Sequence, residues 1–355
     1  MATQDQVKIA IVGAGLIGPR HAQSVVKCCG ATLTCFVDPS PGAQAIARSF
    51  DVPIFKDISG MLQAADVPDA AIVCTPNHTH VALSQELLEA GLHVLVEKPV
   101  STDIASGQAL LRTATLSGKQ LLAGHHRRFN PYVTAVKRTL DNAAIGQPIA
   151  VSGIWALYKP RSYYEPPADW RAGSTGGPIL INLSHEIDIL QYLLGPITRV
   201  HAEQTVSHRG HEAEEGAAVL LRFASGVVGT FLLSDATPSA HNFESGTGEN
   251  PIIPKAGRDF YRIFGTEGTL SVGDMKVTRH SAGEKSWTSK LQETDVKLGK
   301  EVPLDAQVEH FVRVVRGEEV PRCSGEDGLR AVVVCSAIKE AMASGTPVDI
   351  RTSKL

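Results

Sequence analysis

The 355-residue sequence is poor in cysteine and contains no long hydrophobic run. Its six cysteines form no CxxC pair and most lie within apolar segments, so we expect buried free thiols rather than disulfides or a zinc site. No apolar run approaches the roughly 20 residues of a membrane-spanning helix. Residues 1–6 have neither a basic region nor a hydrophobic stretch typical of a signal peptide. We therefore expect a cytoplasmic protein in a reducing compartment, with no membrane partner.

The sequence also lacks an excess of charge of either sign. Lysine and arginine number 34 and aspartate and glutamate 37, which gives a formal net charge of −3. No helical pattern carries a dense basic face, so we expect no attraction to nucleic acid or to a membrane surface. A hydrophobic fraction of 43% and a charged fraction of 20% are typical of a globular protein with large cores. The length suits two domains.

The first third of the chain alternates short β-branched runs with longer helical patterns. The runs predict strands at residues 7–12, 32–37, 70–74, 93–96 and 120–123, separated by helices at 16–28, 41–50, 80–90 and 103–117. Strands that are apolar throughout and are separated by helices indicate a parallel sheet covered on both faces. We therefore predict a doubly wound α/β domain over residues 1–126.

The remaining residues, 127–355, have a different pattern. A helix at 132–140 precedes runs with partial alternation at 149–158, 200–206, 217–223, 226–234, 261–264 and 269–272, and further helices are expected at 179–194, 305–316 and 325–344. This order predicts an α+β domain with an open, mostly antiparallel sheet and helices on one face. Residues 217–223 and 227–233 are apolar at both alternating sets of positions, so we expect both sheet faces to be buried. We expect the free face to form a homodimer or homotetramer interface.

Residues 235–258 are rich in proline, glycine, serine and asparagine and lack periodicity. Loops of this length in compact domains are usually functional or disordered. Two interpretations stay open: a mobile surface excursion, or a loop that folds over a substrate pocket.

A glycine-rich hexapeptide, Gly13-Ala-Gly-Leu-Ile-Gly18, directly follows the first predicted strand and opens a helix. In this context Gly13 permits a tight turn, Gly15 lets the backbone approach a pyrophosphate, and Gly18 lets the helix pack on the strand. The amides of Leu16 and Ile17 then face the phosphates from the helix N-terminus. A glycine-rich turn without a ligand is the alternative, and the strand–turn–helix context favours a Rossmann dinucleotide site.

The identity of the cofactor follows from the end of the second strand. Asp38 lies twenty positions after Gly18, where a carboxylate accepts hydrogen bonds from the adenosine ribose and repels a 2′-phosphate. The nearest arginine after it, Arg48, is more than two helical turns further along. We therefore predict NAD in preference to NADP.

Later motifs make a family recognisable. Together with the GxGxxGxxH of residues 13–21, they are Thr75-Pro-Asn-His-Thr-His80, Glu97-Lys-Pro99, Arg127-Arg-Phe-Asn-Pro131, the segment 176–188 and the tail 327–350. In this combination the chain resembles the glucose–fructose oxidoreductase/inositol dehydrogenase (Gfo/Idh/MocA) family over nearly its whole length. The resemblance implies a Rossmann domain joined to an open antiparallel sheet. It also implies oxidation or reduction of a carbinol in sugars, polyols and related compounds.

The resemblance assigns roles position by position. The nicotinamide half of the cofactor is expected to contact Thr75, Pro76, Asn77, His80, Glu97 and Lys98. In this family the peptide bond between such a lysine and proline is often cis, which aims the lysine inward. The chain departs from the family at one point, because many members carry an aspartate four residues before the helix histidine. Here Ile181 takes that position and Asn182 lies three residues before His185.

Two residues are candidates for the catalytic proton transfer. Lys98 is at the carboxyl end of a parallel strand, and partial desolvation lowers the pKa of a lysine. His185 titrates near neutrality and lies on a helix of the other domain. Asn182 and Asp188 share a helix face with it, to bind a substrate hydroxyl and to orient the imidazole. A core histidine and a solvated loop lysine are the alternatives, and which residue takes the proton stays open.

Other residues complete the expected substrate site. Arg128 belongs to the third motif, and Tyr158, Trp170 and Arg171 belong to an aromatic and basic cluster between two predicted elements. Such a cluster suits a sugar or hydroxy acid, although it equally suits packing. The histidine pairs lack a third ligand at a compatible spacing, so we predict no metal site.

Three functions compete. We favour hydride transfer between NAD and a sugar, a polyol or a cyclic hydroxy acid. The alternatives are an NAD-dependent glycosidase that oxidises its substrate transiently, and an NAD-binding regulator without turnover. The presence of both Lys98 and His185 argues against the regulator. The sequence does not name the substrate.

Overall fold

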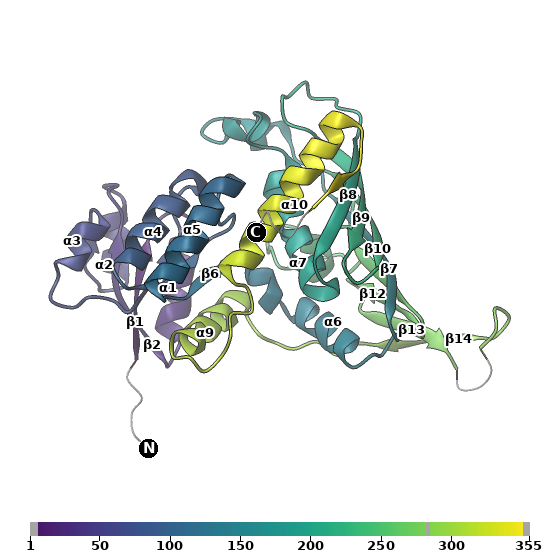
Figure 1. Cartoon of the computed structure of the whole chain (residues 1–355), viewed down its shortest axis with the longest axis horizontal. Coiled ribbons are helices and arrows are strands. Elements are labelled where there is room, and N and C mark those ends of the chain that lie inside the picture. Colours follow the sequence, from purple (N-terminus) through teal and green to yellow (C-terminus); the bar gives the residue numbers. More distant parts are fainter. Residues whose placement is uncertain (1–5, 282–284, 351–355) are drawn as a thin grey trace, which may run out of the picture. The chain divides into compact units, whose positions relative to one another are not determined.

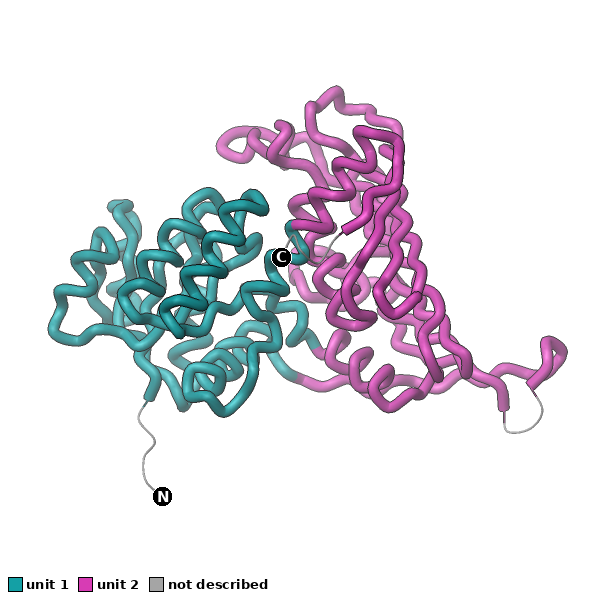
Figure 2. The backbone as a smooth tube through the Cα atoms, viewed as in Figure 1, with its two compact units in different colours: residues 1–130, 301–332, 355 teal, residues 131–300, 333–354 magenta. Residues whose placement is uncertain are grey.

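The computed structural model describes residues 6–281 and 285–350, which form two compact units (Figure 2). Unit 1 comprises residues 1–130 and 301–332, and unit 2 comprises 131–300 and 333–354. This division differs from the single boundary expected after residue 126, because the chain returns to unit 1 near its end. Within the described residues, no helix has the length and apolar character needed to cross a bilayer. All six cysteines are free, and only Cys29 is exposed.

Unit 1 contains a six-stranded parallel sheet in the order β3-β2-β1-β4-β5-β6. Its strands are β1 (Val7–Val12), β2 (Ala31–Val37), β3 (Ile54–Phe55), β4 (Ala70–Val73), β5 (His93–Val96) and β6 (Leu121–Ala123). Its helices are α1 (Gly18–Lys27), α2 (Ala43–Ser49), α3 (Ile58–Leu62), α4 (His80–Glu89), α5 (Ile104–Ser117) and α9 (Pro303–Val315), with 3-10 turns η1 (Asn77–Thr79) and η2 (His126–Phe129). The strand order reverses between β1 and β4, where ligands of such sheets bind. The predicted doubly wound α/β fold is confirmed.

The core of unit 1 explains why the chain returns to it. Ile9 and Ile72 of the central strands are fully buried, as the apolar character of these strands predicts. Val308 and Phe311 of α9 are also fully buried and belong to the same core cluster. In addition, the Ser24 hydroxyl of α1 donates to Asp305 of α9 at 2.6 Å. Helix α9 is therefore an integral part of unit 1.

Unit 2 is a nine-stranded sheet in the order β14-β13-β12-β11-β7-β10-β9-β8-β15. Its strands are β7 (Pro148–Ala156), β8 (Ile197–Gln204), β9 (Gly216–Phe223), β10 (Val228–Ser234), β11 (Tyr261–Gly265), β12 (Thr269–Val272), β13 (Lys276–His280), β14 (Leu291–Asp295) and β15 (Val348–Asp349). Its helical elements are α6 (Pro131–Asp141), η3 (Arg161–Tyr164), η4 (Asp169–Ala172), η5 (Ile179–Leu183), α7 (Ser184–Leu194), α8 (Phe243–Thr247) and most of α10 (Gly325–Ser344). Among the strands of the described residues in this sheet, only β7 and β10 pair in parallel, so the predicted mostly antiparallel sheet is confirmed.

The two faces of this sheet differ in exposure within the single chain, so the expectation that both are buried stays a prediction that requires a partner subunit. Figure 1 shows α6 and α7 against one face. Val219 and Phe231 point to the buried side, whereas Leu220, Val228 and Leu232 are exposed at 54%, 52% and 46%. A single chain thus presents a largely apolar sheet face to solvent.

The segment 235–258 is neither a mobile excursion nor a simple loop. It contains α8, whose N-cap residue Asn242 accepts a hydrogen bond from the Ser245 amide at 2.8 Å. The Asn242 side chain also donates to the Ala156 carbonyl of β7 at 2.9 Å, and Phe243 is fully buried. Shortening this segment would therefore remove part of the unit 2 core and should destabilise the fold.

Candidate functional site

The glycine turn after β1 has the geometry of a nucleotide-binding loop. Gly13 has a φ of +100°, and a Cβ atom at Gly18 would lie 2.0 Å from the Gly13 carbonyl oxygen, so both positions require glycine. Gly15 differs, because a Cβ atom there would meet nothing within 4 Å. Helix α1 has no side-chain cap at its N-cap residue Ile17. Pro19 has no N–H and the Arg20 amide donates to the Ile17 carbonyl oxygen at 3.1 Å, so the amides that an anion could use are those before Pro19. The side chain of Leu16 is 99% exposed, so it does not pack over these amides.

Asp38 follows β2 and is tied to this turn. One carboxylate oxygen accepts a hydrogen bond from the Ala14 amide at 2.7 Å, and the other accepts from the Ser40 amide at 2.8 Å and its hydroxyl at 2.5 Å. Burial raises the pKa of the Asp38 carboxyl, but these hydrogen bonds outweigh burial and hold the pKa below its usual value. The carboxylate is therefore charged at neutral pH and only half-buried, so a ribose hydroxyl can still reach it.

His80 connects two loops at the carboxyl ends of β4 and β5. Its Nδ1 lies 2.8 Å from the Pro99 carbonyl oxygen, and its Nε2 lies 2.8 Å from the Thr75 carbonyl oxygen. The ring is buried, and the Lys98–Pro99 peptide is cis. Because both ring nitrogens contact backbone, these contacts support a role for His80 in holding the two loops. They do not favour the expected direct contact with the cofactor.

Glu97, at the end of β5, is engaged within unit 1. Its Oε1 lies 2.8 Å from Nε2 of His21 on α1, and its Oε2 accepts from the Lys98 amide at 3.2 Å. Burial raises the pKa of the Glu97 carboxyl, but the hydrogen bond with His21 and the charges of His21, His126 and Lys98 lower it to about 2. The buried carboxylate thus fixes the strand end that carries the half-buried Lys98. His21, which ends the GxGxxGxxH spacing, was not among the predicted site residues, and the structure shows it as the partner of Glu97.

Arg128 is buried within unit 1. Its Nη1 donates to the Arg322 carbonyl oxygen at 2.5 Å and lies 3.4 Å from the Asp327 carboxylate. These contacts anchor Arg128 between η2 and the segment 322–327, and the expected substrate contact stays a prediction.

The candidate substrate residues of unit 2 lie on and beside helix α7. The expected continuous helix begins instead as a π-helical turn, η5, and this turn carries Asn182. Helix α7 follows with His185 and Asp188, which are 8% and 1% exposed. Single π-helical turns occur frequently at functional sites, because they shift side chains out of the regular helical register. Asn182 is thereby separated from the regular spacing of His185 and Asp188.

An aromatic and basic cluster surrounds Lys159, which was not among the residues predicted for the substrate site. The Lys159 ammonium lies 2.6 Å from Oδ1 of Asn182 and 4.6 Å from the Tyr163 ring centroid. The Arg171 guanidinium lies over the same ring at 4.0 Å, and 5.8 Å from the Trp170 ring. The structure thus brings together Arg171, Trp170 and Asn182 through Tyr163 and Lys159. Trp170 and Tyr158 remain exposed, at 47% and 54%.

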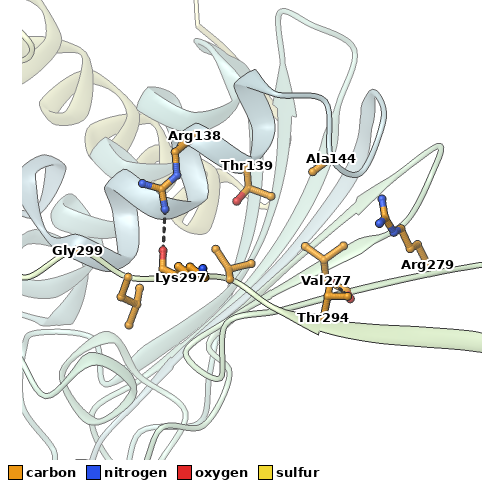
Figure 3. A pocket seen from close by; sticks show the side chains of 10 residues that line it. Arg138, Thr139, Ala144, Val277, Arg279, Thr294, Lys297 and Gly299 are labelled. Carbon is orange, nitrogen blue, oxygen red and sulfur yellow. Dashed lines mark hydrogen bonds between the residues drawn. The ribbon is translucent and has the colours of Figure 1, made fainter.

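A separate cavity of about 510 Å³ lies between α6 and the hairpin of β13 and β14 (Figure 3). It is lined by three cations, Arg138, Arg279 and Lys297, and by no carboxylate. The Arg138 guanidinium donates to the Lys297 carbonyl oxygen at 2.6 Å. Since the lining offers neither a proton acceptor near neutrality nor any residue of the sites described above, this cavity is not a candidate active site.

Two family models match the chain in succession. Residues 7–125 match the NAD-binding Rossmann fold of the GFO/IDH/MocA oxidoreductase family, and residues 137–350 match the C-terminal alpha/beta domain of that family. The scyllo-inositol 2-dehydrogenase (NAD(+)) of Bacillus subtilis (strain 168) is 28% identical, over 98% of this chain and 97% of the relative. The inositol 2-dehydrogenase of Rhizobium meliloti (strain 1021) is 27% identical, over 97% and 99%. The 1,5-anhydro-D-fructose reductase of Ensifer adhaerens is 24% identical, over 96% and 98%.

Solved structures share the fold over nearly the whole chain. The WlbA dehydrogenase from Bordetella pertussis, in complex with NADH and UDP-GlcNAcA, has a TM-score of 0.79 at 21% identity and covers 99% of both chains. An oxidoreductase from Agrobacterium radiobacter, in complex with NAD+, L-tartaric acid and magnesium, has a TM-score of 0.80 at 20% identity, over 97% and 98%. With both domains matched in order, this chain belongs to the Gfo/Idh/MocA family of oxidoreductases and has that family's NAD(P)-binding Rossmann domain.

Proposed function

We propose that this protein is an NAD-dependent dehydrogenase that acts on a CH–OH group of a sugar, a polyol or a cyclic hydroxy acid. The observation that carries the proposal is the presence of two titratable groups at the ends of well-ordered elements. Lys98 follows the buried Glu97 in unit 1, and His185 lies in the first turn of α7 in unit 2. The names of the relatives, two inositol 2-dehydrogenases and a reductase of 1,5-anhydro-D-fructose, support a polyhydroxylated substrate.

The chemistry requires removal of a hydride from carbon and of a proton from the hydroxyl oxygen. Bound NAD supplies the hydride acceptor. We propose that the glycine turn and Asp38 hold the nucleotide, and that Lys98 and His185 act on the hydroxyl proton. Asp188, one turn after His185, orients the imidazole, and Asn182 binds a substrate oxygen. A group that takes the hydroxyl proton as the hydride leaves avoids a protonated carbonyl intermediate.

A substrate panel tests the proposal. Purified protein is incubated with inositol isomers, aldoses, sugar acids and sugar alcohols, and NADH formation is followed by absorbance. We expect net NADH from at least one free polyol or sugar. Release of a sugar from a glycoside without net NADH would instead identify the transiently oxidising glycosidase. Tight NAD binding without any turnover would identify the regulator.

The preference for NAD should depend on Asp38. Its charged carboxylate repels a 2′-phosphate, so the unmodified enzyme should have a higher kcat/KM with NAD than with NADP. Asp38→Ala should narrow this difference by about tenfold or more, because one tenfold step needs only about 1.4 kcal/mol. Asp51→Ala, at an exposed position after α2, is the matched control and should leave the preference unchanged. Equal efficiency with both cofactors in the unmodified enzyme would contradict this assignment.

We also propose that a second copy of this chain covers the exposed face of the unit 2 sheet. Leu220, Val228 and Phe264 line a hollow of about 470 Å³ on that face, together with the polar Arg199 and His201. An apolar centre with a polar rim is typical of interfaces in symmetric dimers. Light scattering should give a dimer or tetramer mass at micromolar concentration, and Leu220→Lys should lower that mass. A monomer mass for the unmodified protein would refute the proposal.

A further inference from the structure

Lys159 is a buried cation of unit 2 that the proposed mechanism leaves unused. It follows β7 by three residues, and its side chain is 7% exposed. Two aromatic rings lie near its ammonium group, Trp155 at 5.3 Å and Tyr163 at 4.6 Å. Burial of an ammonium at such a position is costly unless other groups compensate the charge.

The compensating groups are of two kinds. The nearest carboxylate oxygen, Oδ2 of Asp235, is 3.8 Å from the Lys159 nitrogen. Asp235 is itself held in place, since it accepts from the Tyr164 hydroxyl at 2.5 Å and from the Arg209 guanidinium at 2.6 Å. The short contact of Lys159 goes instead to Oδ1 of Asn182, at 2.6 Å. The Asp235 carboxylate therefore compensates the charge of Lys159, whereas the hydrogen bond of the Lys159 ammonium goes to the side-chain amide of Asn182.

This contact settles the orientation of the Asn182 carboxamide. An ammonium group only donates hydrogen bonds, so the atom that faces Lys159 must be the amide oxygen. The two hydrogens on Nδ2 consequently point away from Lys159. Asn182 is partly exposed, and within residues 6–281 and 285–350 no partner of Nδ2 is found. Asn182 thus offers donors, and not an acceptor, at the start of the helix that carries His185.

We propose that Lys159 is a positioning residue that fixes Asn182 as a hydrogen-bond donor, so that the substrate site selects a ligand with an acceptor oxygen at that point. Such an oxygen is a hydroxyl in the alcohol and a carbonyl in the ketone. A donor to this oxygen complements a base that removes its proton, because it stabilises the negative charge that develops on oxygen. The inference rests on the proposed function, whose mechanism it specifies.

The charges around Lys159 make the orientation sensitive to pH. Burial lowers the pKa of Lys159 to about 8, although Asp235 and Glu244 raise it, while Arg171 and Arg209 lower it further. Tyr163 also faces the ammonium, but burial raises the pKa of its phenol, so it stays neutral in this range. Below about pH 8 the ammonium holds the amide oxygen. Above it, a neutral amine both donates and accepts, and the single orientation of Asn182 is lost.

Steady-state kinetics of a double-mutant cycle tests the proposal. Lys159→Met and Asn182→Ala should each raise the KM for substrate or lower kcat/KM at least about tenfold, with little change in the KM for NAD. If Lys159 acts through Asn182, the double variant should be no worse than Asn182→Ala alone. Lys276→Met, at an exposed lysine of β13 with a surface partner, is the matched control and should behave as the unmodified enzyme. If the loss of kcat/KM in the double variant equals the product of the losses in the two single variants, the proposal is overturned.

A spectroscopic measurement covers the cases in which Lys159→Met does not fold or no substrate is turned over. The side-chain amide resonance of Asn182, assigned by its loss in Asn182→Ala, should shift between about pH 7 and about pH 9 with a midpoint near the pKa of Lys159. In Lys159→Arg, whose charge persists over this range, the resonance should not shift. A resonance that is flat with pH in the unmodified protein, or that titrates unchanged in Lys159→Arg, would overturn the proposal. Failure of the proposed function would appear separately, as absence of NADH formation by the unmodified enzyme.

Discussion

His185→Ala should lower kcat at least about a hundredfold, because removal of a general base typically costs two to four orders of magnitude. The affinity for NAD should change little, since the candidate nucleotide-binding residues are those of unit 1. Stopped-flow absorbance of NADH and titration of NAD by fluorescence measure the two effects. Lys98→Ala should lower kcat to a similar extent.

His208→Ala is the matched control, because this histidine is exposed on the connection between β8 and β9. It should retain normal turnover. Turnover close to normal in His185→Ala, with a protein of unchanged thermal stability, would leave His185 as a core histidine. A loss of stability that parallels the loss of turnover would mean that the imidazole supports the fold.

Gly15→Ala should weaken NAD binding at least about tenfold without changing the melting temperature. The unliganded chain has room for a methyl group at this position, since nothing lies within 4 Å of the Cβ site. The methyl group would instead occupy the space in which we place the pyrophosphate. Isothermal titration calorimetry with NAD, beside a thermal melt, separates the two effects.

Variants of two further glycines serve as comparisons for Gly15→Ala. Gly42→Ala, at the N-cap of α2, also meets nothing within 4 Å and should bind NAD normally. Gly18→Ala should destabilise the fold itself, because its Cβ atom would lie 2.0 Å from the Gly13 carbonyl oxygen. Normal NAD affinity in Gly15→Ala would show that the nucleotide does not approach the turn there.

The parallel sheet was predictable because its strands are short and mostly apolar and alternate with helical patterns, as in a sheet covered on both faces. Strand β14 was not, because all five of its residues are exposed and no hydrophobic pattern marks them. The two-residue strands β3 and β15 are too short to carry a periodic signal. The segment 235–258 resembled a loop in composition, yet the hydrogen bond from Asn242 to Ala156 ties it to a strand far away in the sequence.

In the candidate sites, too, local motifs were predictable from the sequence and contacts between distant residues were not. The glycine turn is a contiguous motif, so the spacing of its glycines predicts the conformation of the turn. By contrast, His21 gains its partner Glu97 across 76 positions, and Lys159 reaches Asn182 across 23, so neither contact leaves a local pattern. The aspartate expected four residues before the helix histidine is missing from the sequence. The structure instead provides a π-helical turn and a buried lysine beside Asn182, which no single-sequence pattern encodes.

Transfer of an isotopic label tests the central claim most directly. The best substrate from the panel is prepared with deuterium on its CH–OH carbon and incubated with NAD, and the NADH formed is examined by mass spectrometry and proton NMR. Direct hydride transfer predicts one deuterium on the nicotinamide ring for each NADH, and a slower rate when the chemical step limits turnover. NADH without deuterium, or an oxidised substrate without NADH, would contradict the assignment of this chain as an NAD-dependent dehydrogenase.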